Sequence, residues 1–263
     1  MKLGACIGMG SPERIDILKK IGYEYVETFL PEAYQADEAT RYAYLDALAR
    51  NGLRCESSAH PFPGTYNPAG EQTKDDLLRA SDAMYEVVSK TRFMGNSILV
   101  IGAGGVRNPR CENPDWDNVY EQLAVVCREV ISPICKEFGL TAALEGLQKA
   151  ESPTFNLTSQ AVATAKKAGC DNVRVMTDYF HIFVEQEDMS LFETFGDMIV
   201  HAHIANPAGR VMPCEGDGAG YAGFFDNLKK AGYNARLSVE ARVQGEFEPT
   251  LAAAYHEMKK YIW

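Results

Sequence analysis

Eight short apolar runs, each followed by a segment with helical spacing, constrain the fold of this 263-residue chain more than any other feature. The runs are rich in aliphatic and β-branched residues and are bounded by Gly, Pro or polar turn residues, which predicts strands. The predicted strands cover residues 3–8, 25–30, 53–59, 97–101, 140–144, 173–177, 199–204 and 237–239. The predicted helices cover residues 12–21, 38–50, 73–93, 115–138, 158–168, 221–231 and 246–261, with short helices between residues 177 and 199.

Strands that alternate with helices indicate parallel βαβ units. Eight such units at this length favour an α/β fold of the (β/α)₈ TIM-barrel type over a doubly wound sheet. The segment Gly102-Ala103-Gly104-Gly105 does not match the G-x-G-x-x-G fingerprint of dinucleotide binding, and no acidic residue follows it at the required spacing. No linker or low-complexity segment interrupts the units, so we expect a single TIM-barrel domain over residues 1–263.

The charge and the apolar content of the chain disfavour nucleic acids and membranes as partners. The 26 Lys and Arg against 36 Asp and Glu give a net charge of −10, which disfavours nucleic acid and anionic membranes as partners. No span approaches the roughly 20 apolar residues of a membrane helix, and the apolar start is too short for a signal peptide. The seven cysteines are scattered without a C-x-x-C pair, which is typical of reduced core thiols. We expect a cytoplasmic protein that binds neither nucleic acid nor membrane.

Four successive predicted strands end on side chains that bind metals. The runs T-A-A-L-E, R-V-M-T-D, I-V-H-A-H and R-L-S-V-E end at Glu145, Asp178, His203 and Glu240. In a barrel the carboxyl ends of the strands converge on one face, so these side chains are expected to meet. Three carboxylates buried together are costly without a cation. Three carboxylates and one imidazole suit Mn²⁺ best, with Mg²⁺, Co²⁺ or Zn²⁺ as alternatives.

Four further residues are candidates for binding substrate. His181 lies three residues after the Asp ligand, and Glu151 lies six residues after the first Glu. Arg210 follows Asn-Pro-Ala-Gly in a loop and suits substrate oxygens, and His60 follows the third strand. Three of them have a plain alternative: Glu151 as a helix cap, Arg210 as a surface residue, and His60 as a loop residue that packs on Phe62.

Residues on the remaining strands are expected to shape the pocket. Cys6, Glu27 and Gly102 lie on or just after the first, second and fourth strands. His201 is expected to face away from His203 and to have a structural role.

With these residues in place, the chain resembles the xylose-isomerase-like barrel superfamily of sugar isomerases and epimerases over essentially its full length. In ketose 3-epimerases of the tagatose and psicose type, Glu, Asp, His and Glu from strands five to eight bind the metal, which matches Glu145, Asp178, His203 and Glu240. The resemblance implies that Glu145 and Glu240 also exchange a proton on either face of a ketose carbon while the metal stabilises the enediolate. It also implies a small sugar substrate and a homodimer or homotetramer.

Other motifs extend the resemblance. The epimerase pattern E-x₅-E begins at Glu145 and ends at Glu151, and the pattern D-x-x-H ends at His181. The substrate arginine of these enzymes corresponds to Arg210, with one extra residue before it. Two features depart from the epimerases: Gln148 stands where many relatives have Asn, and the segment H-I-A-N-P-A-G-R-V-M-P resembles the hydroxypyruvate isomerases.

Several activities stay open on these patterns. An aldose–ketose or hydroxypyruvate-type isomerase would use the same metal site, and so would a lyase acting on a keto-inositol. An abasic-site endonuclease on this barrel needs many histidines for three zinc ions, and the chain has five on an acidic background. A non-catalytic sugar-binding subunit is disfavoured by the presence of Glu145 and Glu240.

Overall fold

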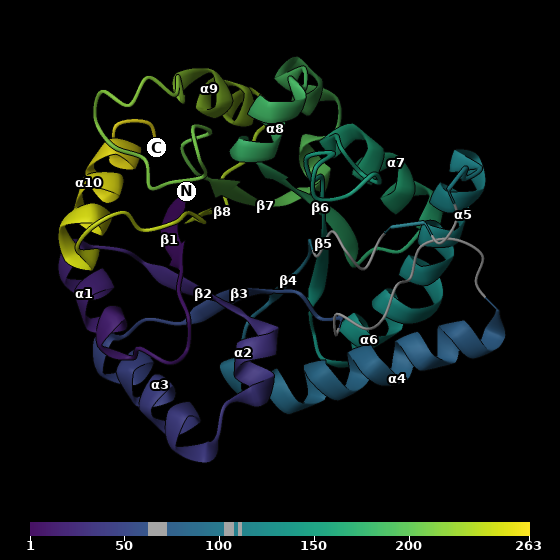
Figure 1. Cartoon of the computed structure of the whole chain (residues 1–263), viewed down its shortest axis with the longest axis horizontal. Coiled ribbons are helices and arrows are strands. Elements are labelled where there is room, and N and C mark those ends of the chain that lie inside the picture. The colour runs from purple at the N-terminus through teal and green to yellow at the C-terminus, as the bar shows by residue number, and fades with distance from the viewer. Residues whose placement is uncertain (63–72, 103–107, 110–111) are drawn as a thin grey trace.

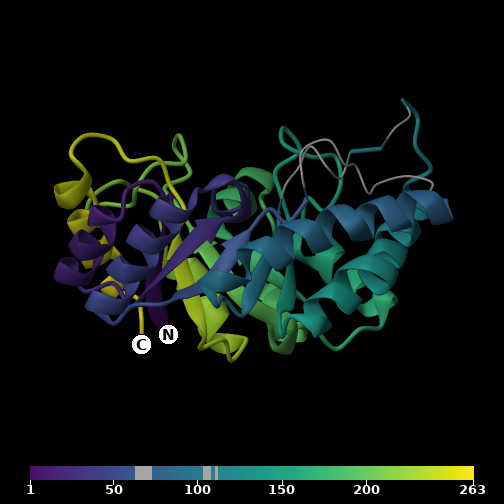
Figure 2. The same ribbon diagram turned by 90° about the horizontal axis from the view of Figure 1, so that it is seen from below.

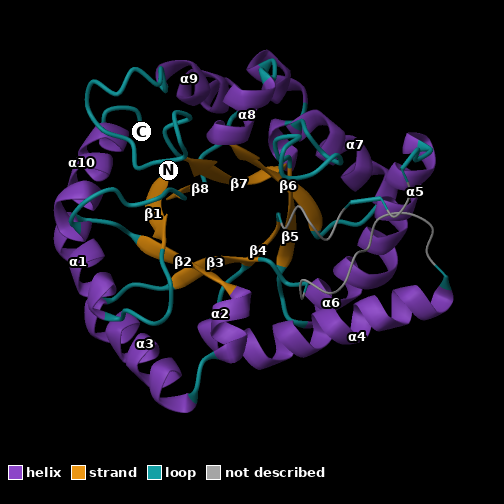
Figure 3. Ribbon diagram, in the orientation of Figure 1, coloured by secondary structure: helices purple, strands orange, loops and turns teal. Residues whose placement is uncertain are grey.

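The computed structural model describes residues 1–62, 73–102, 108–109 and 112–263. Eight parallel strands close into a barrel in chain order (Figures 1 and 3), which confirms the predicted TIM barrel. The strands are β1 (Lys2–Cys6), β2 (Tyr25–Phe29), β3 (Cys55–Ala59), β4 (Ile98–Ile101), β5 (Thr141–Glu145), β6 (Val173–Asp178), β7 (Ile199–Ile204) and β8 (Arg236–Val239). Pairing of β1 with β8 completes the ring.

The helices surround this ring on the outside (Figure 1). They are α1 (Glu13–Ile21), α2 (Leu30–Gln35), α3 (Glu38–Asn51), α4 (Lys74–Thr91), α5 (Trp116–Val126), α6 (Ser132–Glu137), α7 (Thr158–Ala168), α8 (Tyr179–Glu185), α9 (Ala222–Lys230) and α10 (Phe247–Lys259). Both termini lie at the same end of the barrel (Figure 2), where the ammonium group of Met1 donates to the carbonyl of Trp263 over 2.8 Å. Along the described residues, no helix combines the length and apolar character needed to cross a bilayer.

Local sequence signals explain where the helices begin and end. Thr73 and Asp76 form a capping box at the start of α4, which satisfies two backbone N–H groups that would otherwise lack a partner. Gly22, Gly52 and Gly169 follow α1, α3 and α7 in the left-handed conformation that favours glycine. α1, α3, α4 and α7, whose ends carry these signals, begin and end within two residues of the predicted bounds.

Two helical features differ from the prediction. The segment predicted as one helix over residues 115–138 contains a π-helical turn, η3 (Cys127–Ile131), between α5 and α6. Pro133 has no N–H to donate, and the backbone N–H of Ser132 reaches the carbonyl of Cys127, one residue further back than in an α-helix. The other difference is α2, a short helix with Pro31 in its first turn, which follows β2 without a loop.

The interior of the barrel is divided into an apolar part and a polar part. Ala59, Ile98, Val100, Ala143 and Met176 form an apolar cluster, contributed by β3 to β6. Across the barrel, β2, β3, β7 and β8 contribute polar side chains that are fully buried: Glu27, Ser57, His201 and Ser238. Branched apolar residues usually fill such an interior, and buried polar groups are costly unless they are hydrogen-bonded. The buried polar side chains therefore have to form hydrogen bonds with one another. They lie below the carboxyl ends of β7 and β8.

Candidate functional site

The structure brings together the four residues that the sequence places at strand ends. Glu145 ends β5, Asp178 ends β6, His203 lies one residue before the end of β7, and Glu240 follows β8 directly. Asp178 and His203 are register partners in the barrel wall. One ligand atom from each of the four side chains lies within 4.8 Å of the others. We call this group the strand-end site.

Arg210 supplies positive charge at the strand-end site. Its Nη2 donates to Oε2 of Glu240 over 2.5 Å and to Oδ2 of Asp178 over 3.2 Å. Its guanidinium also lies over the ring of Phe180, 4.9 Å from the ring centre. The backbone around it is unusual, because Arg210 has a φ of 53° directly after Gly209 with a φ of 92°. This turn directs a loop cation back over the barrel mouth.

The imidazole of His203 connects the strand-end site to the barrel interior. Its Nε2 lies 3.0 Å from Oε1 of Glu27, and its Nδ1 lies 3.1 Å from Oε2 of Glu240 and 3.7 Å from Oε1 of Glu145. Among the described residues, this buried Nδ1 makes no well-directed hydrogen bond. A histidine that binds a metal through one ring nitrogen usually donates the N–H of its other ring nitrogen to a carboxylate or a carbonyl. His203 has this arrangement, with Nε2 at Glu27 and Nδ1 facing the carboxylates of the strand-end site. The donor set therefore fits a divalent cation.

Charge balance shifts the ionisation of the strand-end site. Burial alone would raise the pKa of the Glu240 carboxyl, but His203 and Arg210 lower this pKa to about 2. Burial raises the pKa of Asp178, although Arg210 opposes the effect. Burial alone would lower the pKa of His203, but Glu27 and Glu240 hold it well above its ordinary value. Glu240 is thus ionised at neutral pH, with positive charge on either side of it.

His181 faces the strand-end site from the start of α8. Its Nδ1 accepts a hydrogen bond from the backbone N–H of Gln148 over 2.9 Å, so a neutral ring carries its hydrogen on Nε2. That Nε2 lies 3.6 Å from Oδ2 of Asp178 and 4.0 Å from Oε1 of Glu145. Burial lowers the pKa of His181, which favours the neutral ring. The side chain is therefore arranged to donate a hydrogen bond into the site.

The other two predicted substrate residues differ in their surroundings. Glu151 lies at the rim, where its Oε1 accepts from Nε2 of Gln148 over 2.8 Å and from Nη1 of Arg210 over 3.4 Å. His60 has a φ of 67° and packs edge-on against the ring of Phe29, 5.4 Å away. It also lines a cavity with Phe62 beside α2 and α4, and its substrate role stays a prediction.

The expectation that His201 faces away from His203 was wrong. Residues two apart in a strand lie on the same face, so both rings point into the barrel, 4.9 Å apart. Both reach Glu27, since Nε2 of His201 lies 2.7 Å from Oε2 of that carboxylate. Glu27 itself, expected at the pocket wall, is completely buried behind the strand-end site. The H-x-H spacing on one strand was the signal that could have revealed this arrangement.

Comparisons with known proteins bear on the family and the fold of this chain. A family model described as xylose isomerase-like TIM barrel matches residues 15–261. The chain is 27% identical to L-ribulose 3-epimerase of Mesorhizobium japonicum over 169 residues, which are 62% of this chain and 54% of that protein. It is 24% identical to hydroxypyruvate isomerase of Escherichia coli over 247 residues, which are 90% of each. The chain thus spans about half the length of the L-ribulose 3-epimerase that it matches.

Solved structures show the same fold. A D-psicose 3-epimerase studied in the presence of D-fructose superposes with a TM-score of 0.83 at 16% identity, covering 100% of this chain and 99% of that one. An L-ribulose 3-epimerase superposes with a TM-score of 0.80 at 18% identity, covering 100% of this chain and 95% of that one. Because the family model covers nearly the whole chain, the protein belongs to the xylose isomerase-like TIM barrel family.

Proposed function

We propose that this chain is a divalent-metal-dependent isomerase or epimerase that moves a carbon-bound proton of a keto-sugar. The observation that carries the proposal is the strand-end site, in which three carboxylates and the imidazole of His203 each bring one ligand atom within 4.8 Å of the others. The names of the relatives, L-ribulose 3-epimerase, D-psicose 3-epimerase and hydroxypyruvate isomerase, support the same class of reaction.

The strand-end site would hold the cation through Glu145, Asp178, His203 and Glu240. A divalent cation bound there supplies positive charge that stabilises the charge developing on substrate oxygens when the proton leaves carbon. Mn²⁺ is the ion we expect, with Mg²⁺, Co²⁺ and Zn²⁺ as alternatives, because oxygen donors predominate.

The proton transfers are assigned to the two glutamates. Glu145 and Glu240 come from strands on either side of β6 and β7, and both carboxylates approach Nδ1 of His203. Carboxylates that face a substrate carbon from two sides can remove a proton from one face and return one to the other. Glu240 is ionised, as a proton acceptor must be, and Nε2 of His181 would donate to a substrate oxygen.

The charges around the strand-end site favour a non-phosphorylated sugar. Arg210 forms ion pairs with Asp178 and Glu240 of the strand-end site and with Glu151, so three carboxylates already engage its guanidinium. A phosphate group would therefore meet little free positive charge. Arg210 and Glu151, linked at the rim, are suited to sugar hydroxyls.

A second candidate is isomerisation of hydroxypyruvate or a similar small keto acid. A relative aligned across 90% of this chain and 90% of its own is a hydroxypyruvate isomerase, and the loop carrying Arg210 resembles that group. In this case Arg210 would exchange one of its carboxylate partners, such as Glu151 at the rim, for the substrate carboxylate.

Incubation with a panel of ketoses and hydroxypyruvate in D₂O tests the reaction type. Because the proton passes through a carboxylate that exchanges with solvent, the product is expected to carry deuterium at the carbon that changes configuration or oxidation state. Mass spectrometry and NMR of the product identify the substrate and the labelled position. Product formed with full retention of the original hydrogen would indicate a hydride shift and contradict the assignment to the glutamates.

Replacement of Glu240 by Gln tests one of the two proton carriers. The amide keeps the shape but cannot accept the proton, so kcat is expected to fall by about 10²- to 10⁴-fold. Glu215→Gln is a matched control, since that side chain is 87% exposed and pairs with Lys260 away from the strand-end site. Wild-type turnover in Glu240→Gln would remove Glu240 from the mechanism.

Gly102, directly after β4, leaves the space that the Glu145 side chain occupies. A Cβ at this position would lie 1.8 Å from Oε2 and 3.1 Å from Cδ of Glu145. The displaced atoms are the far end of a side chain, so the carboxylate would move while the barrel stays intact. Glycine at this position is thus a requirement of the site.

Gly102→Ala is therefore expected to lower kcat on the order of 10²-fold, as a misplacement of about 1 Å can do, with little change in unfolding free energy. Gly10→Ala is the control, because its added Cβ would meet no atom within 4 Å. Enzyme assays and urea denaturation of both variants provide the comparison. Equal kcat values for the two variants would show that the position of the Glu145 carboxylate does not limit the reaction.

A further inference from the structure

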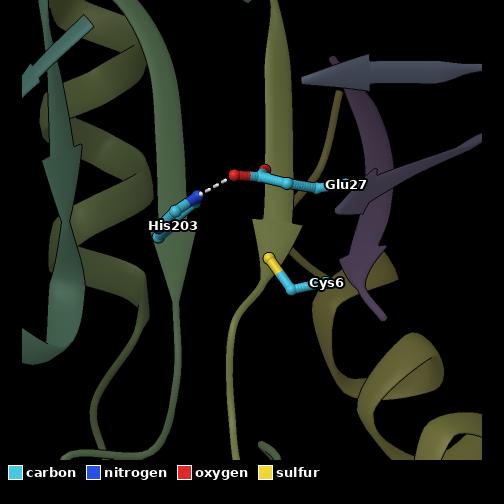
Figure 4. A group of neighbouring side chains, drawn as sticks. All are labelled: Cys6, Glu27 and His203. Carbon is cyan, nitrogen blue, oxygen red and sulfur yellow. Dashed lines mark hydrogen bonds and ion pairs between the residues drawn. The ribbon is translucent and has the colours of Figure 1, made fainter. Parts of the chain in front are cut away.

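A single buried carboxylate organises the polar part of the barrel interior. Glu27 Oε2 accepts hydrogen bonds from the hydroxyls of Ser57 over 2.7 Å and Ser238 over 2.6 Å. The same oxygen lies 2.7 Å from Nε2 of His201, and Oε1 lies 3.0 Å from Nε2 of His203. Figure 4 shows the link from Glu27 on β2 to His203 on β7. Four donors from three other strands thus converge on one carboxylate.

The residues around Glu27 suggest an alternative role for it, as a ligand in a second cation site. The sulfur of Cys6 lies near Glu27 and His203 (Figure 4), and the ligand atoms of these three residues all lie within 4.8 Å of one another. Both carboxylate oxygens of Glu27, however, are already engaged by donors, and a cation there would have to displace the hydrogen on Nε2 of His203. The contacts favour a supporting role for Glu27 over a ligand role.

We propose that Glu27 is a positioning residue that holds His203 with Nε2 protonated, so that Nδ1 is the nitrogen presented to the metal. A carboxylate only accepts hydrogen bonds, so Nε2 of His203 must carry the hydrogen. The lone pair of a neutral ring is then on Nδ1, which faces Glu145 and Glu240. Such partners of metal-binding histidines fix the ring and the tautomer. The inference rests on the proposed function, since it presupposes a cation at the strand-end site.

The other members of the network fix Glu27 in turn. The hydroxyl of Tyr25 lies 2.7 Å from that of Ser238, which donates to Glu27, so the Tyr25 hydroxyl is the donor in this pair. Gly4 leaves room for the ring of Tyr25, because a Cβ there would lie 2.4 Å from it. The position of the carboxylate is thus set by β1, β2, β3 and β8, and it sets the ring on β7.

Titration of the metal-free protein with Mn²⁺ by calorimetry tests the proposal. In Glu27→Gln, an amide NH₂ replaces one carboxylate oxygen, although all the groups around this position are hydrogen-bond donors. The His203 ring therefore loses its fixed acceptor. Mn²⁺ affinity is expected to fall by about 10- to 100-fold, with one ion still bound per chain. Glu27→Asp, which keeps the charge but withdraws it from His203, serves as a second variant should the amide fail to fold.

Glu56→Gln is the matched control. Glu56 lies on β3 at the opposite end of the barrel, where it pairs with Lys2 and Arg236, and its variant should bind Mn²⁺ as wild type does. Wild-type affinity in folded Glu27→Gln or Glu27→Asp would overturn the positioning role alone. A second bound ion that is lost in Cys6→Ser would make Glu27 a ligand instead. Absence of Mn²⁺ binding by the wild type would overturn the metal centre, and the role of Glu27 with it.

Discussion

Three carboxylates, those of Glu145, Asp178 and Glu240, lie together at one end of the barrel and repel one another. At about 4 Å, two like charges near a protein surface repel by about 4 kcal/mol. Asp178 and Glu240 are balanced by Arg210, and His203 lies between Glu240 and Glu145. A barrel that gathers negative charge in this way needs positive charge in return. Arg210 and His203 supply part of this positive charge, and a divalent cation at the same place would supply more.

The barrel interior is built to support this arrangement. Its apolar part, around Val100 and Met176, resembles the packed interior of any TIM barrel. Its polar part replaces that packing with hydrogen bonds to Glu27, from hydroxyls and imidazoles that are themselves buried. Buried polar groups that satisfy one another fix positions more narrowly than apolar contacts, because each bond has a direction. The hydrogen bonds around Glu27, one layer deeper in the barrel, thus help to fix the side chains of the strand-end site.

The sequence predicts the eight strands and the four strand-end residues because both depend on local patterns. Apolar runs and their turn residues mark each strand. The carboxyl ends of barrel strands lie on one face of the barrel, whichever helices and loops connect the strands. Contacts across the barrel are different. That Glu27 on β2 bonds His203 on β7 depends on which strands face each other and at what height, which no short pattern records. The π-turn before Pro133 likewise follows from one missing N–H within an otherwise regular helical pattern.

The error at His201 has a simpler origin, because strand geometry alone places His201 and His203 on the same face. For His181 the pattern pointed to the site, but only the backbone N–H of Gln148 shows which ring nitrogen faces Asp178 and Glu145. Side-chain chemistry near a site can thus be predicted from spacing, whereas tautomers and hydrogen-bond directions require the folded chain.

Anomalous diffraction from crystals grown with Mn²⁺ tests directly whether the strand-end site binds a divalent cation. We expect one anomalous peak per chain at about 2.0–2.6 Å from carboxylate oxygens of Glu145, Asp178 and Glu240 and from Nδ1 of His203. A peak bound instead by Cys6 and Nε2 of His203 would contradict it. So would a saturated crystal without a peak, in which Arg210 still bridges Asp178 and Glu240.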